Sequence, residues 1–149
     1  MATTIDNATL TVTVNEDIKL NGQQVGSKIV QAIAGINEAS RRVLSVPTYE
    51  TEILALSSSA GGGTYVTSNL KYIRVSNMDD TNFVRITFVS GSSNRYDMKL
   101  PAKRTAIFTS PSISGSDGGA GFGSFVSFDS MKATADTSSV DLELFVAST

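Results

Sequence analysis

Short alternating segments separated by turn-forming residues constrain this chain more than any other feature of its sequence. From residue 49 onward, runs of five to eight residues alternate apolar with polar side chains, the period of a strand with one buried face. The segments expected as strands are 49–56, 70–76, 83–89, 96–100, 105–109, 122–128 and 140–147. Stretches rich in Gly, Ser and Asn separate them, and this spacing is typical of a β-sandwich or barrel.

The N-terminal residues add one more strand and a tight turn. Residues 9–14 read TLTVTV, so Leu10 and Val12 share one face of an expected strand while the threonines occupy the other. A short segment at 18–20 is closed by Asn21-Gly22, a strong turn signal because both residues tolerate positive φ.

The period then changes in residues 26–44, where apolar side chains recur every three to four positions between Ser27 and Pro47. Ser27 can cap a helix and Pro47 stands just beyond its end, so an amphipathic α-helix is predicted. The expected fold is all-β: a jelly-roll-like β-sandwich of about eight strands with one N-terminal amphipathic α-helix. All 149 residues fit one domain, with an N-terminal strand or arm in 1–24, the helix in 26–44 and the sandwich in 49–149.

Composition excludes several classes of function. With no cysteine and no histidine, the chain has no disulfide, no zinc cluster and no His-dependent triad. Its 12 basic and 14 acidic residues give a net charge of −2, whereas nucleic-acid binders need a basic surface to displace counterions from phosphate. No apolar run approaches the roughly 20 residues that span a bilayer, and the first residues lack a signal-peptide pattern. We therefore expect no nucleic-acid partner and no membrane partner.

Catalysis and cofactor binding are not expected either. Glu50, Glu52 and Glu143 are the carboxylates from which a glycosidase pair could be drawn. The first two alternate with apolar residues on an expected strand and are predicted to face solvent. The glycine-rich stretch at 114–123 lacks the Lys and the following helix of a phosphate-binding loop. We predict a non-enzymatic protein that uses no cofactor.

The tip between two expected strands, NMDDTN at residues 77–82, places two carboxylates side by side. Asp79 and Asp80, with Asn77 and Asn82, supply oxygen ligands, so the tip is a weak candidate for a calcium site. The spacing and the terminal Glu of a calcium loop are missing. A hairpin turn whose Asn and Asp side chains bond their own backbone is the favoured interpretation.

Four apolar or loop residues are candidates for contact with a partner. Leu10 and Val12 lie on the apolar face of the first expected strand. Asp117 and Phe122 belong to the glycine-rich loop, which is expected to be a surface loop. The alternative is that this loop touches a neighbouring subunit, since glycine allows close approach.

Four arginines are further candidates. Arg41 and Arg42 would close the expected helix, where cations interact favourably with the helix dipole, and partner binding is the alternative. Arg74 and Arg85 stand among apolar residues inside expected strands. There they either contact another chain or pair with a carboxylate across strands, and the sequence leaves both open.

The second half of the chain, residues 70–147, resembles small virion structural proteins of tailed bacteriophages. The likeness lies in three phrases in a fixed order: IRVSNMDDTNFVRITF, then MKLPAKRTAIF, then TADTSSVDLELFVAS. The chain departs from that pattern where Lys103-Arg104 stand in place of a glycine after the Leu-Pro-Ala step.

The resemblance implies a β-sandwich that assembles on a phage particle, as a capsid decoration or cement protein. A tail, neck or fibre component is the alternative, and a carbohydrate-binding module using loops near 61–63 and 117–121 is an alternative of another class. The implied partners are further copies of the chain and a phage capsid or tail protein. Open sheet edges need a partner or a cover, and we expect closed symmetry of three-fold or higher order, as in a trimer. The implied location is the virion, after assembly in the host cytoplasm.

Overall fold

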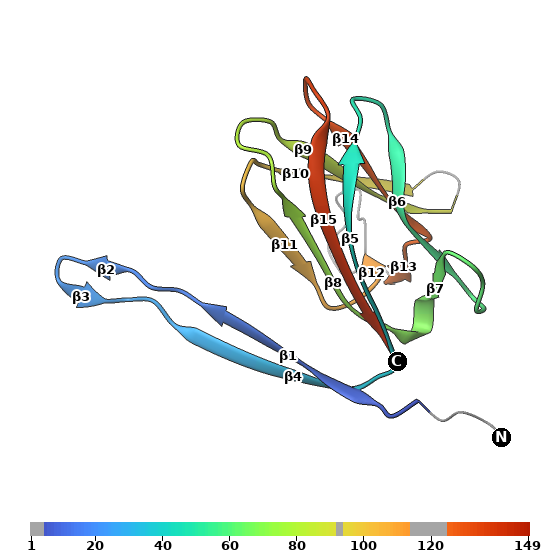
Figure 1. Cartoon of the computed structure of the whole chain (residues 1–149), viewed down its shortest axis with the longest axis horizontal. Helices are drawn as coiled ribbons and strands as arrows, with labels where there is room; N and C mark the ends of the chain where they lie inside the picture. The colour runs from blue at the N-terminus through green and yellow to red at the C-terminus, as the bar shows by residue number, and fades with distance from the viewer. Residues whose placement is uncertain (1–4, 92–93, 114–124) are drawn as a thin grey trace, which may run out of the picture. The chain divides into compact units, whose positions relative to one another are not determined.

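The computed structural model describes residues 5–91, 94–113 and 125–149, and it confirms the all-β class. The single helix among these residues is a short 3₁₀ turn, η1 (Thr67–Asn69). The chain divides into two compact units. Residues 1–38 with Thr149 form one, called here the hairpin unit, and Ala39–Ser148 form the other, called the two-sheet unit. Figure 1 shows the strands of both units.

The hairpin unit is a two-stranded antiparallel ribbon that ends in a smaller hairpin (Figure 1). Its strands are β1 (Ala8–Asn15), β2 (Lys19–Leu20), β3 (Gln23–Gln24) and β4 (Lys28–Ile36). β1 pairs with β4 and β2 pairs with β3. Asn21 and Gly22 have φ of 50° and 81°, so the predicted Asn-Gly turn is present, with the positive φ values that this turn requires.

The helix expected over 26–44 is wrong, because β4 and β5 (Glu38–Val46) occupy this stretch. Val25, Ile29 and Ile33 are four residues apart, and that spacing places side chains on one face of a strand as well as of a helix. Their β-branched side chains favour the strand. Gly35 has φ of 79°, which lies outside the right-handed helical region. The apolar periodicity is present, but it belongs to strands and not to a helix.

Two larger sheets make up most of the two-sheet unit. The five-stranded sheet has the order β10-β9-β14-β6-β7. Its strands are β6 (Thr51–Ser57), β7 (Thr64–Val66), β9 (Val84–Ser90), β10 (Asn94–Leu100) and β14 (Ser130–Ala135). The four-stranded sheet has the order β11-β8-β15-β5. Its further strands are β8 (Leu70–Asn77), β11 (Thr105–Phe108) and β15 (Val140–Ser148), and a separate pair joins β12 (Ser112–Ile113) to β13 (Val126–Ser127).

The strand pairs of this unit are nested. β9 pairs with β10, β8 with β11 and β6 with β14, all antiparallel, and β5 lies beside β15. Pairing of β14 with β9 and of β15 with β8 joins these strand pairs into the two sheets. The unit is therefore one long antiparallel ribbon, with β9 and β10 at its closed end, folded over on itself.

One hydrophobic core fills the space between the two sheets. Ile73, Val75 and Leu144 from the four-stranded sheet and Ile86 and Met131 from the five-stranded sheet belong to one buried cluster. The ring of Phe88 lies 5.1 Å from the rings of both Phe108 and Phe128 in edge-to-face contacts. Side chains that alternate with these core residues point away from the core, and they form the outer face of each sheet.

Candidate functional site

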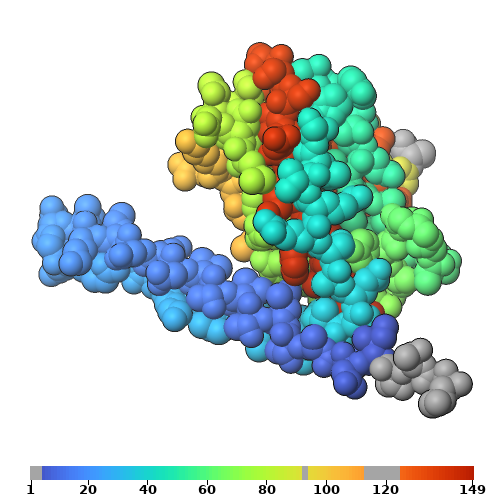
Figure 2. Space-filling view, in the orientation of Figure 1, coloured from blue at the N-terminus to red at the C-terminus, as the bar shows by residue number. Residues whose placement is uncertain are grey.

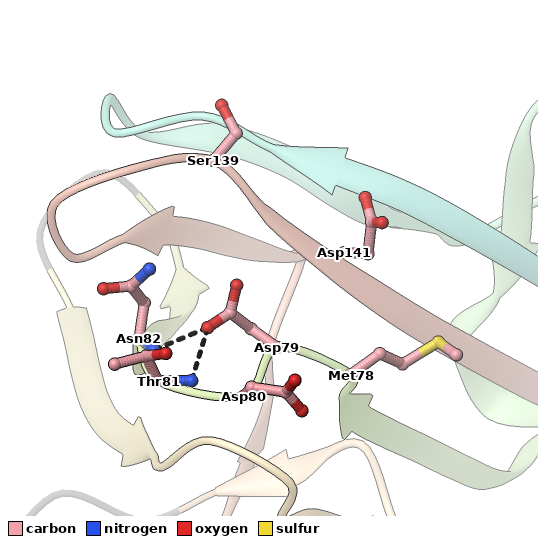
Figure 3. Close-up of a pocket in the computed structure, with 7 residues that line it drawn as sticks. All are labelled: Met78, Asp79, Asp80, Thr81, Asn82, Ser139 and Asp141. Atoms are coloured by element: carbon pink, nitrogen blue, oxygen red, sulfur yellow. Dashed lines mark hydrogen bonds between the residues drawn. The ribbon is translucent and has the colours of Figure 1, made fainter.

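The tip at residues 77–82 is a turn that bonds its own backbone. Asp79 Oδ1 accepts hydrogen bonds from the backbone N–H groups of Asn82 at 2.6 Å and Thr81 at 2.7 Å (Figure 3). Asn77 Oδ1 accepts another from the N–H of Asp79 at 2.9 Å. The N–H groups of Asn82 and Thr81 hold the pKa of Asp79 below its ordinary value, because they bond the ionised carboxylate. This is the bonding that the turn interpretation expects.

A shallow hollow of about 300 Å³ lies beside this tip. It is lined by Met78, Asp79, Asp80, Thr81, Asn82, Ser139 and Asp141 (Figure 3). The carboxylate of Asp80 pairs with Lys103 Nζ at 2.9 Å rather than turning toward Asp79. Across the described residues, no group of three acidic side chains is placed to hold a metal ion. Asp79 and Asp80 thus each have a partner within the protein, and the calcium site stays a prediction.

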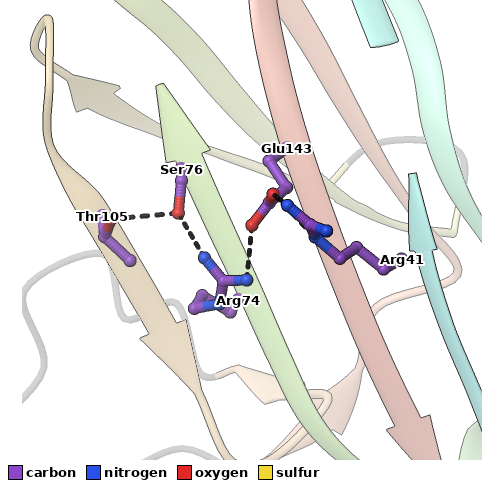
Figure 4. Close-up of polar contacts among 5 residues, drawn as sticks. All are labelled: Arg41, Arg74, Ser76, Thr105 and Glu143. Carbon is purple, nitrogen blue, oxygen red and sulfur yellow. Dashed lines mark hydrogen bonds and ion pairs between the residues drawn. The ribbon is translucent and has the colours of Figure 1, made fainter. Parts of the chain in front are cut away.

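The outer face of the four-stranded sheet holds a polar network around Glu143 (Figure 4). The Glu143 side chain is only 8% exposed, although it alternates with the core residues Leu142 and Leu144. Its Oε2 accepts a hydrogen bond from Arg41 Nε at 2.8 Å, and its Oε1 pairs with Arg74 Nη2 at 2.5 Å. A carboxylate buried at a sheet surface is stable only when such partners replace its water.

The network continues across the sheet. Arg74 Nη1 donates to Ser76 Oγ at 2.8 Å, and Ser76 Oγ lies 2.9 Å from Thr105 Oγ1 (Figure 4). With Arg41 on β5 and Glu143 on β15, the five side chains tie together all four strands of the sheet. Hydrogen bonds from Arg41 and then Arg74 hold the pKa of Glu143 below its ordinary value.

The outer face of the five-stranded sheet is covered by ion pairs. Glu50 pairs with Arg95 and, at 3.1 Å, with Lys132, and both cations lower its pKa, Arg95 first. Arg85 lies 4.0 Å from a carboxylate oxygen of Asp97, whose other oxygen accepts a hydrogen bond from Thr87 at 2.6 Å. This face is therefore polar and internally paired.

These contacts decide where the predicted arginines lie. Arg74 and Arg85 each pair with a carboxylate across strands, which is one of the two alternatives left open by the sequence. The helix-dipole explanation for Arg41 and Arg42 is wrong, since no helix is present there. Arg42 instead donates to the backbone carbonyl of Ile53 on the neighbouring sheet.

Sequence reasoning missed the burial of Glu143 and the ion pairs of Glu50. The alternating polar position of Glu143 in VDLELF gave no signal of its own. Its partner Arg41 lies 102 residues earlier, in the stretch that was assigned to a helix. Asp117 and Phe122, both predicted as partner contacts, lie outside the described residues.

The predicted contact residues Leu10 and Val12 lie on an apolar face of the hairpin unit. The pairing of β1 with β4 sets Leu10 opposite Ile33 and Val14 opposite Ile29, so these side chains share one face with Val12. The other face presents the threonines of β1, opposite Ala32 and Val30. This gives the ribbon one apolar face and one mixed face.

The apolar character continues to the tip of the hairpin unit. A backbone hydrogen bond from Val25 N–H to the Ile18 carbonyl joins these two residues across the ribbon. Ile18, Leu20, Val25 and Ile29 are 53%, 61%, 56% and 61% exposed. From residue 5 onward the unit contains no second layer of strands, so no described part of it covers these side chains.

Comparison with known proteins gives no family for the chain: no family model matches it, and no curated protein matches it significantly. In the part of the chain that the structure describes, no helix is both long enough and apolar enough to cross a bilayer.

Proposed function

We propose that this chain is a non-enzymatic structural protein of a tailed bacteriophage, which decorates or cements the capsid by docking its hairpin unit on a neighbouring protein. The observation that carries the proposal is the apolar face of the ribbon formed by β1 and β4, which has no cover within its own unit. A two-stranded hairpin is at best marginally stable alone in water. Burial of its aliphatic side chains against a neighbour supplies the missing stabilisation.

We further propose that the two-sheet unit is a β-sandwich of the jelly-roll type. When its strands β5, β6, β8, β9, β10, β11, β14 and β15 are numbered one to eight, the sheets have the orders 1-8-3-6 and 2-7-4-5. Rolling an antiparallel ribbon with four nested strand pairs into two layers produces these orders. Jelly rolls recur in viral capsid proteins and in lectins, which supports a role on a particle and also keeps carbohydrate binding as the second candidate.

The non-enzymatic part of the proposal has its own support. Glu50, Glu143 and Asp80, three of the carboxylates that could serve as acid or base, are each held by a cation. Asp79 is held by backbone N–H groups of its own turn. Acidic groups fixed in this way stabilise turns and sheet faces and are not poised for proton transfer.

The likeness of residues 70–147 to phage virion proteins supports a phage particle as the structure on which the chain assembles. The test is immunogold labelling of phage particles produced from the genome that encodes the chain. We expect label on the heads. Label on tails or fibres would select the tail alternative, and particles without label would overturn the proposal.

A matched pair of substitutions tests whether the hairpin unit does the docking. Ile29→Asp puts a charge on the apolar face, while Thr13→Asp puts the same charge on the opposite face of the same ribbon. We expect the first to abolish co-sedimentation with particles that lack the protein and the second to retain it. Equal binding by both variants would show that another surface docks. A glycan array, read with and without calcium, tests the carbohydrate alternative.

A further inference from the structure

We infer that the hairpin unit docks, through its apolar face, on the outer face of the four-stranded sheet of a second copy of this chain, and that two copies exchange hairpins reciprocally. The inference rests on the proposed docking role of the hairpin unit and names its partner. Four observations carry it: the shape of the apolar face, the contrast between the two sheet faces, the charges, and the area.

The apolar face of the hairpin unit has the form of a narrow stripe. Side chains of β1 and β4 form its first part, and the Ile18–Val25 pair with Leu20 forms its second. Polar residues interrupt it at two places: Gln31 stands opposite Val12, and Glu16 bonds Ser27 between the Val14–Ile29 and Ile18–Val25 pairs. A stripe of this kind fits a flat sheet surface better than a deep groove.

Only one outer sheet face of the two-sheet unit offers a comparable surface among the described residues. On the five-stranded sheet, the outward residues of β9 and β10 are dominated by Arg85, Arg95 and Asp97, which are engaged in ion pairs. On the four-stranded sheet, Val43 is 55% exposed and Ile107 is 41% exposed. Figure 2 shows β8 (green), β15 (red) and β5 (teal) side by side on this face.

Apolar residues of this face flank the side chain of Arg74. Ile107 pairs with Arg74, and Arg74 pairs with Phe145, in one row of the four-stranded sheet. The guanidinium of Arg74 lies 6.0 Å from the centre of the Phe145 ring, and Tyr72 packs edge-on against the same ring at 5.9 Å. Val43 stands on β5, two residues after Arg41 and on the same side of that strand.

Individual charged groups on the two surfaces can pair. Residues 5–38 contain two lysines and four acidic residues, a net charge of −2. On the sheet face, Arg41 and Arg74 flank the carboxylate of Glu143, and Asp141 stands exposed two residues earlier on the same side of β15, so these four charges balance. The Arg41 side chain is 66% exposed, and Glu16 and Asp17 form no ion pair with any described residue. Contact between the hairpin unit and the sheet face would bring Arg41 close to Glu16 and Asp17, which carry the opposite charge.

The area favours reciprocal exchange over a single contact. The stripe from Leu10 to Leu20 is about 35 Å long and two strands, or about 10 Å, wide, so one docked hairpin buries roughly 700 Å² on the two surfaces together. That is below the roughly 1,200–2,000 Å² of stable interfaces, but two exchanged hairpins bury about 1,400 Å². A two-fold dimer therefore meets the requirement, and each subunit donates and receives one hairpin.

Site-specific cross-linking tests this arrangement, because the chain has no cysteine of its own. Full-length Ile29→Cys, on the apolar stripe, is mixed with full-length Val43→Cys, on the sheet face, and treated with a short bis-maleimide. This reagent tolerates separations wider than a disulfide allows. We expect the mixed dimer to form at least roughly ten-fold faster than in control mixtures, because contact raises the effective concentration of the two thiols. The controls are Thr13→Cys with Val43→Cys, and Ile29→Cys with Arg85→Cys.

The mass of the protein in solution is the second measurement. Light scattering of the unmodified chain at micromolar concentration should give about twice the 15.7 kDa monomer. Efficient linking of Ile29→Cys to itself would indicate hairpin–hairpin contact and overturn the inference, as would an intrachain product of the double variant in a monomer. A monomer that still labels phage heads through its hairpin would leave the proposed function standing with a different partner. A cross-linked dimer that labels no particle would support the exchange of hairpins and contradict the proposed function.

Discussion

The hairpin unit and the two-sheet unit use the same kind of amphipathic strand in opposite ways. In the two-sheet unit, Val75, Ile86 and Leu144 are at most 1% exposed, because each sheet covers the apolar face of the other. In the hairpin unit, Ile29 and Leu20 are each 61% exposed, because the ribbon has no second layer. The difference lies in the number of layers, since both units alternate apolar and polar residues along their strands.

This difference supports the proposal that the two-sheet unit provides stability and the hairpin unit provides association. Buried aliphatic side chains stabilise a fold by their removal from water, and exposed ones remain available to stabilise a complex. A single chain can thus fold through one unit and assemble through the other. One matched pair of substitutions tests the contrast between the units, and further substitutions rank the contributions to stability within the two-sheet unit.

The largest effect is expected from shortening a core side chain. Ile86→Ala should lower the free energy of unfolding by about 2–5 kcal/mol, since it leaves a cavity between the two sheets. The matched change Ile29→Ala in the hairpin unit should alter it by less than about 0.5 kcal/mol. Urea denaturation followed by circular dichroism, at a concentration where the protein is monomeric, measures both. Similar losses for the two variants would mean that the hairpin unit is part of the same cooperative core.

An intermediate effect is expected at the polar network of the four-stranded sheet. Glu143→Gln removes the charge that Arg41 and Arg74 share and should cost about 1–2 kcal/mol, a value reduced by the exposure of Arg41. Glu52→Gln, at an exposed position of β6, is the control and should leave stability unchanged. The measurement is again urea denaturation at neutral pH.

The same variant has a predictable dependence on pH. The pKa of Glu143 is lower in the folded chain than in the unfolded chain, so its contribution is present above the ordinary glutamate pKa of about 4.3 and is lost as the pH falls through the folded value. Stability of the original chain should therefore decline in acid, and Glu143→Gln should flatten the decline. Part of the decline will remain in the variant, because the pKa values of Glu50 and Asp79 are also lowered in the folded chain. An unchanged acid limb in the variant would contradict this role of Glu143.

The smallest effect is expected at the tip of residues 77–82. Asp79→Ala removes the acceptor of two backbone N–H groups and should lower the melting temperature, by less than Glu143→Gln does. Asp80→Ala removes only an exposed ion pair with Lys103 and should leave the melting temperature unchanged. Differential scanning calorimetry compares the two. An equal loss for both would indicate that the charge of the tip, and not its turn geometry, stabilises it.

Local chemistry made some of these features predictable. The Asn21-Gly22 turn, β1 and the strand–turn–strand around 77–82 follow from turn residues and strict alternation, which act over a few positions. β14 was not expected, because its inward positions Met131, Ala133 and Ala135 are mostly small and give a weak apolar signal. Alanines suffice there because β14 lies between β9 and β6 in the sheet.

Long-range partners account for the rest. The spacing in residues 26–44 suits a strand and a helix equally, and only the pairing of β4 with β1 and the position of β5 beside β15 select the strand. The network of Glu143 could not be derived for the same reason, since its members come from four strands. The apolar residues Leu10 and Val12 could be identified as contact candidates from alternation alone, but the absence of a second layer could not.

The nested strand pairs have a consequence for the order of events during synthesis. The outermost strand pair joins β5 to β15. The four-stranded sheet therefore cannot form completely until residues 140–148 have left the ribosome. The β9–β10 pair is local and can form first, whereas the outermost pair must bring together segments about 100 residues apart, which makes folding slow. The hairpin unit leaves the ribosome before the two-sheet unit, so its apolar stripe is exposed for most of the synthesis of the chain and can be bound by chaperones during that time.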